Sequence, residues 1–126
     1  MLLVAAAGND GPCTDCVNYP AKYDTVMAVS SVDCNDDWAS FSSQGPEVEI
    51  CAPGEDISST YPCDSCKTLS GTSMATPQVA GAGAILMAQG WDNAGARKHL
   101  RDTADDIGLS SNRQGAGRLD VADATC

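Results

Sequence analysis

The sequence predicts an α/β domain built on a parallel sheet. Short apolar segments bounded by Gly, Pro, Asn or Asp are typical of strands that are covered on both faces, as in parallel sheets. A long apolar run in the second half predicts an enclosed helix. Strands come first and helices follow, which is compatible with part of a layered α/β fold. At 126 residues, the chain is the size of one domain.

Three segments are predicted to be strands, at residues 2–7, 26–32 and 48–52. The first of them lacks the basic leader of a secretion signal and runs directly into a turn, so we expect a strand there. A hairpin is predicted over residues 58–71, with its turn around residues 63–66. Because so few strands would leave a central edge unpaired, we expect the fold to be incomplete.

Three helices are predicted after the hairpin. The first covers about residues 73–89, is ended by Gly90, and is apolar on all sides, so we expect it to be buried on every face. The second is capped by Asp92 or Asn93. Its apolar stripe consists of Ala96, Leu100, Thr103, Ala104 and Ile107. A short helix is expected over residues 119–124.

Acidic residues outnumber basic residues by 17 to 7, which gives a formal net charge of −10. Nucleic acids and anionic membranes are polyanions, so this balance disfavours both as partners. No segment approaches the length of about 18 uninterrupted apolar residues that spans a bilayer. We therefore expect no nucleic-acid or membrane partner, and a protein suited to high salt or to the outside of the cell.

The chain holds seven cysteines, and four of them form two CxxC pairs, Cys13 with Cys16 and Cys63 with Cys66. Disulfides in an oxidising compartment are one hypothesis. A zinc or redox module built on all four is another, although the long separation of the pairs is unusual for zinc ribbons. The sequence leaves the pairing open. Cys51, within the apolar segment VEICAPG, is predicted to be an inert buried thiol.

Several motifs resemble those of one protein family. The segment at residues 71–81, GTSMATPQVAG, resembles the nucleophile motif of the subtilisin-like serine proteases, the subtilases, and AAAGNDG at residues 5–11 resembles their oxyanion-hole segment. Other similar segments follow in the family's order: YPAKY, VMAVSSVD, ASFSSQGPEVEICAPGEDISST and GAGRLDVADA. The resemblance covers essentially the whole chain and implies a subtilisin-like fold.

The resemblance implies that Ser73 is the nucleophile and that Asn9 donates to the oxyanion. Elementary physics agrees, because the first turn of a helix has unpaired N–H groups and a positive dipole end, which stabilise an oxyanion. Asn9 follows the carboxyl end of a predicted parallel strand, where ligands of open α/β sheets gather. Taken alone, the two segments would be an ordinary helix cap and a turn. The implied substrate-binding residues are Ala6, Ala7, Gly8, Asn18, Gly71 and Thr72.

A serine hydroxyl needs a base, which in this family is a histidine oriented by an aspartate. Both come from segments that precede the oxyanion-hole strand in the family's order. We therefore expect residues 1–126 to be the C-terminal part of a peptidase catalytic domain. The only histidine, His99, lies in the basic segment ARKHLRD and is expected to have a surface role. Gln78 stands where relatives often carry a non-catalytic histidine.

The predicted function is that of a secreted serine endopeptidase, which hydrolyses peptide or protein substrates through an acyl-enzyme on Ser73. Its partner would be the missing N-terminal half of the domain, without which this fragment is expected to be inactive. The alternative is a non-catalytic pseudo-protease, an interaction fragment that buries its open edge on another chain.

No cofactor is required by this chemistry. Glu47 and Glu49, with backbone carbonyls near Ala21, Tyr23 and Val26, resemble a weak cation site of some relatives, and such oxygen ligands suit calcium or sodium. The alternative is that the two glutamates are simply exposed acids at alternate positions of a strand.

Overall fold

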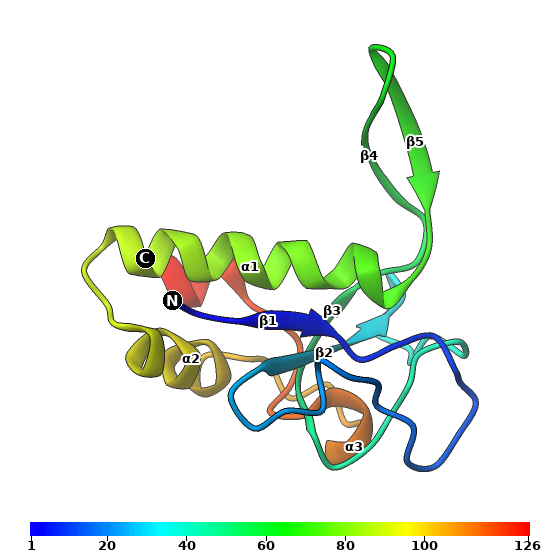
Figure 1. Ribbon diagram of the computed structural model, residues 1–126, viewed down its shortest axis with the longest axis horizontal. Coiled ribbons are helices and arrows are strands. Elements are labelled where there is room, and N and C mark those ends of the chain that lie inside the picture. Colours follow the sequence, from blue (N-terminus) through cyan, green and yellow to red (C-terminus); the bar gives the residue numbers. More distant parts are fainter.

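A computed structural model describes residues 1–126 (Figure 1). Its centre is a three-stranded parallel sheet in the order β1-β2-β3, formed by β1 (Val4–Ala6), β2 (Met27–Val32) and β3 (Val48–Pro53). The predicted parallel α/β architecture is confirmed, and all three strands lie within or one residue beyond the predicted segments. β1 is at an edge of the sheet and pairs with β2 alone.

The sheet is covered on both faces, which explains why its strands are mainly apolar. All six residues of β2 are buried. One face of the sheet packs against helices in a core of twelve residues: Met27, Val29, Ile50, Ala52, Ala75, Val79, Ala82, Leu86, Ala96, Leu100, Leu119 and Ala124. The other face packs against loops in a core of five: Ala7, Val17, Ala21, Ala28 and Val48.

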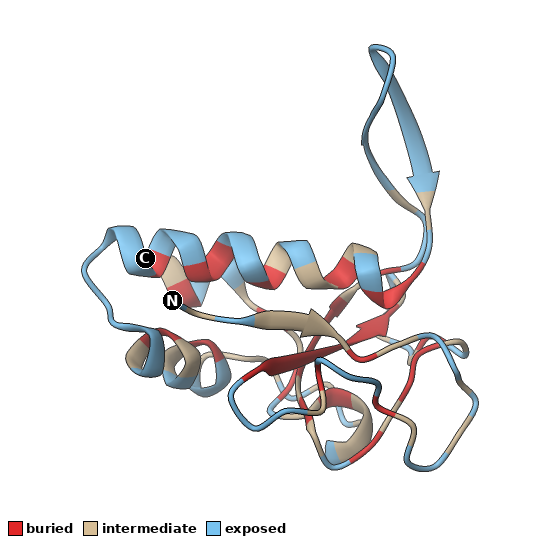
Figure 2. Cartoon of the chain, viewed as in Figure 1, coloured by how far each residue is buried: buried red, intermediate tan, exposed pale blue.

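Helix α1 (Thr72–Ala88) crosses over the sheet and corrects one prediction. We expected it to be buried on every face, but only one stripe is buried, and the opposite face is open to solvent (Figure 2). The exposed residues include Ala80, Gly81, Ala84, Ile85 and Met87. The composition misled because alanine and glycine leave no polar face that would mark a solvent side.

The remaining helices are α2 (Asn93–Asp102), α3 (Ser111–Gln114) and α4 (Val121–Thr125). The Asp92 side chain accepts a hydrogen bond from the Gly95 N–H at 2.7 Å, which confirms the predicted cap of α2. Helix α3 was not predicted, because four residues are too short for a visible period. None of the helices combines the length and the apolar character needed to cross a bilayer.

The apolar stripe predicted for the second helix is only half correct. Ala96 and Leu100 are fully buried in the core. Thr103, Ala104 and Ile107 are half-buried because α2 ends at Asp102, so they no longer follow its helical period.

The predicted hairpin is confirmed, as β4 (Ile57–Tyr61) pairs antiparallel with β5 (Ser65–Leu69). It projects away from the body of the molecule, and most of its residues are exposed (Figures 1 and 2). The turn is made by residues 62–64, where Cys63 and Asp64 adopt left-handed φ values of 66° and 52°. The hairpin runs directly into the start of α1.

The packing of α1 predicts unequal effects at two neighbouring residues. Leu86 is fully buried, whereas Ile85 is 44% exposed. We expect Leu86→Ala to lower the free energy of unfolding by about 2–5 kcal/mol, because it leaves a cavity in the core. The control, Ile85→Ala, should change it by about 0.5 kcal/mol or less. Urea unfolding measures both values, and equal losses would contradict the one-sided packing.

Burial of Cys51 predicts a dependence of stability on alkaline pH. Desolvation raises the pKa of its thiol from 9.0 to about 12, so folding favours the neutral form. The resulting stabilisation is present below pH 9 and is lost as the pH rises through about 12. We expect Cys51→Ala to reduce the alkaline decline in unfolding free energy. The exposed control, Cys34→Ser, should keep the wild-type slope, and an unchanged slope in Cys51→Ala would refute the assignment.

Candidate active site

The end of β1 and the start of α1 meet at one point of the molecule. The Ala7 N–H donates to the Val29 carbonyl at 2.8 Å, which continues the backbone pairing with β2 one residue beyond β1. The Gly71 N–H donates to the Gly54 carbonyl at 2.7 Å, which fixes the entry to α1 behind the end of β3. Positions 9 and 73 lie near each other in space, because both adjoin Gly71.

Asn9 is held by Thr72. Its Oδ1 accepts hydrogen bonds from the Thr72 N–H at 3.0 Å and from the Thr72 hydroxyl at 2.9 Å. The Gly8 N–H donates to the same hydroxyl at 3.2 Å. These bonds occupy the oxygen of the Asn9 carboxamide and leave its Nδ2 group with no hydrogen bond inside the chain.

Two donor nitrogens and the Met74 sulfur adjoin one small space beside Gly71. A Cβ atom added at Gly71 would lie 3.4 Å from Asn9 Nδ2 and 3.7 Å from the backbone N of Ser73. Because glycine has no Cβ, the space stays open to an atom of a bound molecule. The geometry therefore offers a carbonyl or oxyanion oxygen two donors at once.

Ser73 is exposed in the first turn of α1, and its hydroxyl makes no hydrogen bond within the chain. The single histidine cannot reach it. His99 lies near the opposite end of α1, and a helix of 17 residues is about 25 Å long. Residues 1–126 thus place no imidazole beside the hydroxyl.

His99 is less exposed than we predicted. Its ring stacks on Trp91, with centroids 4.5 Å apart and an interplanar angle of 22°. Its Nε2 lies 3.1 Å from the Ala124 carbonyl oxygen. Rather than a solvated surface group, His99 is a packing residue that joins α2 to α4.

The predicted substrate-binding residues fall into two groups. Gly71 and Thr72 adjoin the donor pair described above. Asn18 lies against the strand end, because its N–H donates to the Ala7 carbonyl at 2.9 Å, and the neighbouring Ala6 is half-buried. The Ala7 side chain is fully buried in the core, so only its backbone is available for binding.

Sequence reasoning missed a contact beside these residues. The Asn18 side chain donates from Nδ2 to Asp10 Oδ2 at 2.6 Å, and the Asp10 N–H donates to Ser43 Oγ at 3.1 Å. The turn signal at residues 8–11 indicated a bend but did not indicate which side chains the bend would bring together.

An open hollow of about 450 Å³ lies between the hairpin and the first turns of α1, and Ser73 and Met74 line it. Gln78 lines it too, and its Nε2 donates to the carbonyls of Pro53 at 2.6 Å and Met74 at 3.1 Å. Gln78 therefore ties the second turn of α1 to the end of β3.

The residues predicted to bind a cation do lie together. Glu47, Glu49, Ala21, Tyr23 and Val26 all line one hollow of about 260 Å³. Glu47 Oε2 is buried without a hydrogen-bond partner, as a cation ligand would be. Its Oε1, however, lies 3.5 Å from the ammonium group of a neighbouring lysine, Lys22.

Glu49 is already paired with a protein cation. Arg97 donates to both of its carboxylate oxygens, and Arg97 Nη2 also donates to the Val26 carbonyl at 3.3 Å. Arg101 Nη1 lies 3.8 Å from Glu49 Oε2. The hydrogen bonds with Glu49 raise the pKa of Arg97 further above its ordinary value. Glu49 and Val26 are therefore engaged by a guanidinium and do not fit a metal ion in this arrangement.

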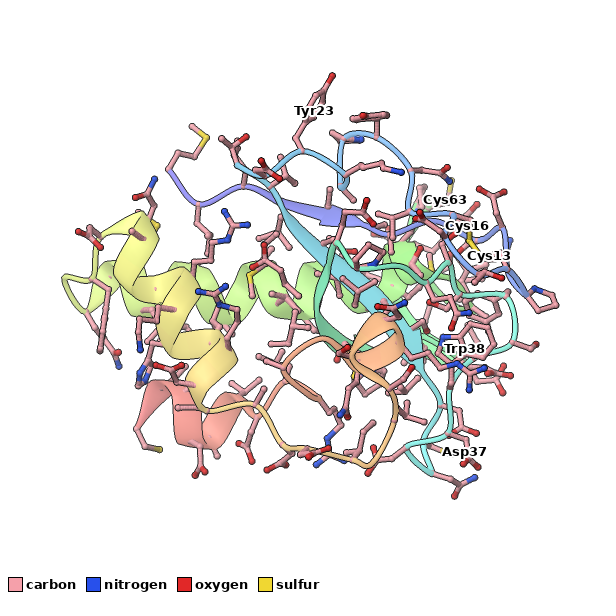
Figure 3. All side chains as sticks on the ribbon, turned by 90° about the horizontal axis from the view of Figure 1, so that it is seen from below. Cys13, Cys16, Tyr23, Asp37, Trp38 and Cys63 are labelled. Carbon is pink, nitrogen blue, oxygen red and sulfur yellow. A yellow bond between two sulfur atoms is a disulfide. The ribbon has the colours of Figure 1, made fainter.

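The two CxxC pairs are in different states. Cys13 and Cys16 form a disulfide with a Cα–Cα distance of 6.1 Å (Figure 3). Cys63 and Cys66 are exposed thiols at the tip of the hairpin. The chain brings no three His, Cys, Asp or Glu side chains into a metal-binding group. The hypothesis of one zinc site shared by four cysteines therefore finds no support.

Comparison with known proteins gives consistent matches over nearly the whole chain. A family model described as the subtilase family matches residues 1–117. The chain is 54% identical over 122 residues to the halolysin-like extracellular serine protease Nep of Natrialba magadii, covering 95% of this chain and 22% of the relative. It is 44% identical over 127 aligned residues to subtilisin BL of Lederbergia lenta, covering 99% of this chain and 46% of that relative.

A solved structure gives the same result. The prenylagaramide maturation protease PagA matches with a TM-score of 0.85 at 33% identity, over 98% of this chain and 49% of that chain. The chain thus spans between about a fifth and a half of the length of these relatives.

The Arg97–Glu49 pair predicts a specific loss of stability. Arg97 and Glu49 are 22% and 17% exposed, whereas Arg101 is 44% exposed. We expect Arg97→Met to lower the free energy of unfolding by about 1–3 kcal/mol, because Glu49 loses its bidentate partner. The matched control, Arg101→Met, should cost about 0.5 kcal/mol or less. Urea titration compares them, and equal costs would argue against the pair as the main link between α2 and β3.

Proposed function

This chain belongs to the subtilase family, and on that premise we propose that it carries half of a serine endopeptidase site. In this proposal Ser73 attacks the carbonyl carbon of a peptide bond and forms an acyl-enzyme. Asn9 Nδ2 and the Ser73 N–H donate to the oxyanion. The main support is the single space beside Gly71 that both donor nitrogens adjoin.

The fixed carboxamide is what makes this arrangement suited to catalysis. Donors that are already oriented stabilise developing charge without reorganising during the reaction. Thr72 holds Asn9 by two hydrogen bonds, and the positive end of the α1 dipole adds to the same field. The site would therefore bind the tetrahedral intermediate better than the planar peptide.

We propose that the base and its orienting acid come from another part of the protein, because no histidine adjoins Ser73. That part would dock on two surfaces left open here, the free edge of β1 and the exposed face of α1. An apolar opening of about 420 Å³ lies between them, lined by Met1, Leu2, Leu3, Val4, Ala80, Gly83, Ala84 and Met87. Relatives more than twice as long as the matched stretch provide the chain length for such a segment.

The same open surfaces favour the second candidate, a non-catalytic interaction fragment. An unpaired strand edge beside an apolar helix face recruits other chains whether or not chemistry follows. The two candidates differ in one property, which is whether Ser73 becomes reactive when the docking segment is supplied.

We also propose that the substrate is a peptide or protein and that the protein works outside the cytoplasm. The Cys13–Cys16 disulfide suits an oxidising compartment, and the matching Nep protein is named as extracellular. A weakly bound calcium or sodium ion would be held by Glu47 and backbone carbonyls rather than by Glu49. It would not take part in peptide hydrolysis, which requires no cofactor here.

A hybrid enzyme tests the proposed function. Residues 1–126 would replace the matching stretch of subtilisin BL, which is 46% of that protein, and the rest of subtilisin BL would supply the docking segment. We expect rapid labelling of Ser73 by a fluorophosphonate probe and peptide hydrolysis. Asn9→Ala should lower kcat about a hundredfold to a thousandfold, the range known for loss of such a donor in a subtilisin. Ser73→Ala should abolish labelling, and His99→Ala should leave it unchanged.

The isolated chain provides the contrasting measurement. We expect it to react with the probe no faster than its Ser73→Ala variant. Rapid labelling of the isolated chain would show that a base lies within residues 1–126, contrary to the proposal. A folded hybrid that neither labels nor hydrolyses would favour the interaction fragment.

A further inference from the structure

The hairpin β4–β5 does not pack against the hydrophobic core, unlike the other strands. Its strands pair only with each other, and residues 58–61 and 65–68 are all exposed. An isolated two-stranded hairpin is at best marginally stable in water. Something other than a core must therefore hold this one if it is to keep a single shape.

Two thiols lie at the tip of the hairpin, where a covalent bond between them would restrain its turn. Cys63 is in the turn. Cys66 is in β5 and pairs with Thr60 of β4, next to the pair Tyr61–Ser65 that closes the hairpin. Both thiols are exposed and unbonded. A bond between them would tie the turn to the strand that follows it.

The chain itself shows that this spacing can close. Cys13 and Cys16 have the same separation of three residues and form a disulfide with a Cα–Cα distance of 6.1 Å, within the usual range of about 4.4–6.8 Å. Zinc is a weaker alternative, since a structural zinc site takes four ligands and the hairpin tip supplies two thiolates. The residues around the tip form no metal-binding group.

We propose that Cys63 and Cys66 form a reversible disulfide that stiffens the hairpin. The oxidant would be a small disulfide such as oxidised glutathione. The Cys63 thiolate attacks one of its sulfurs, which breaks that S–S bond and releases one glutathione. The Cys66 thiolate then attacks the Cys63 sulfur and releases the second. Two protein thiols are oxidised, one glutathione disulfide is reduced to two thiols, and their protons pass to the two products.

A disulfide at the tip would also affect the hollow beside Ser73. Side chains of β4 and β5, among them Thr60 and Lys67, line the same hollow as Ser73. Closing the disulfide would limit the motion of that wall, because it removes conformational freedom from the open form. This inference goes beyond the proposed protease function and is tested without any measurement of activity.

Peptide mapping gives the first test. The chain is equilibrated with oxidised glutathione, the remaining thiols are alkylated, and an endoproteinase that cleaves before aspartate is added. Cleavage before Asp64 separates Cys63 from Cys66. We expect one species in which the peptide ending at Cys63 stays joined to the peptide that begins at Asp64, until a reductant parts them. Glutathione left on both cysteines, or both alkylated, would overturn the proposal, as would stoichiometric zinc bound to the reduced chain.

Hydrogen exchange gives the second test. We expect backbone amides of β4 and β5 to exchange at least about tenfold more slowly in the oxidised chain than in the reduced chain, because local opening is restricted. Cys63→Ser and Cys66→Ser should lose this response, and neither exposed side chain supports the core. Cys34→Ser, which removes another exposed thiol, should respond like the wild type. Equal exchange in the two redox states would refute a stiffening role.

Discussion

The structure depends on β2 being buried on both faces. A strand with six buried residues must have a layer on each side, and the chain supplies α1 on one side and the loops around Val17 and Ala21 on the other. Parallel pairing then brings the ends of β1 and β3 to the same edge of the sheet as the start of α1. The position of the candidate site follows from this packing, since the residues that form it lie in the connections at that edge.

Much of this arrangement could be predicted from the sequence. The strands are apolar and bounded by turn residues, the hairpin lies between two such signals, and Asp92 stands where a cap is needed. The solvent face of α1 could not be predicted, because its alanines and glycines suit either environment. That Asn9 lies beside Ser73 was predicted only from the family resemblance, and its hydrogen bonds with Thr72 were not predicted, since residues 63 positions apart carry no local sign of contact.

The partners of the ion pairs could not be predicted from local sequence patterns either. Arg118 donates to Asp36 and to Asp105, at 2.7 Å and 2.8 Å, and joins two loops that are distant in sequence. Those hydrogen bonds raise the pKa of Arg118 above its ordinary value. In a chain with 17 acidic and 7 basic residues, the sequence holds many candidate carboxylates for Arg118, and only the fold decides which of them it contacts.

Thr72 also sets the direction of the carboxamide at position 9. Its hydroxyl accepts from Gly8, so its single proton can be turned toward Asn9 Oδ1. If the amide rotated by half a turn, an NH₂ group would face the backbone N–H of Thr72 and two donors would oppose each other, which is costly in a partly enclosed place. The end of β1 therefore leaves the NH₂ group of Asn9, and not its oxygen, beside the space at Gly71. A molecule that binds there must place a hydrogen-bond acceptor next to it.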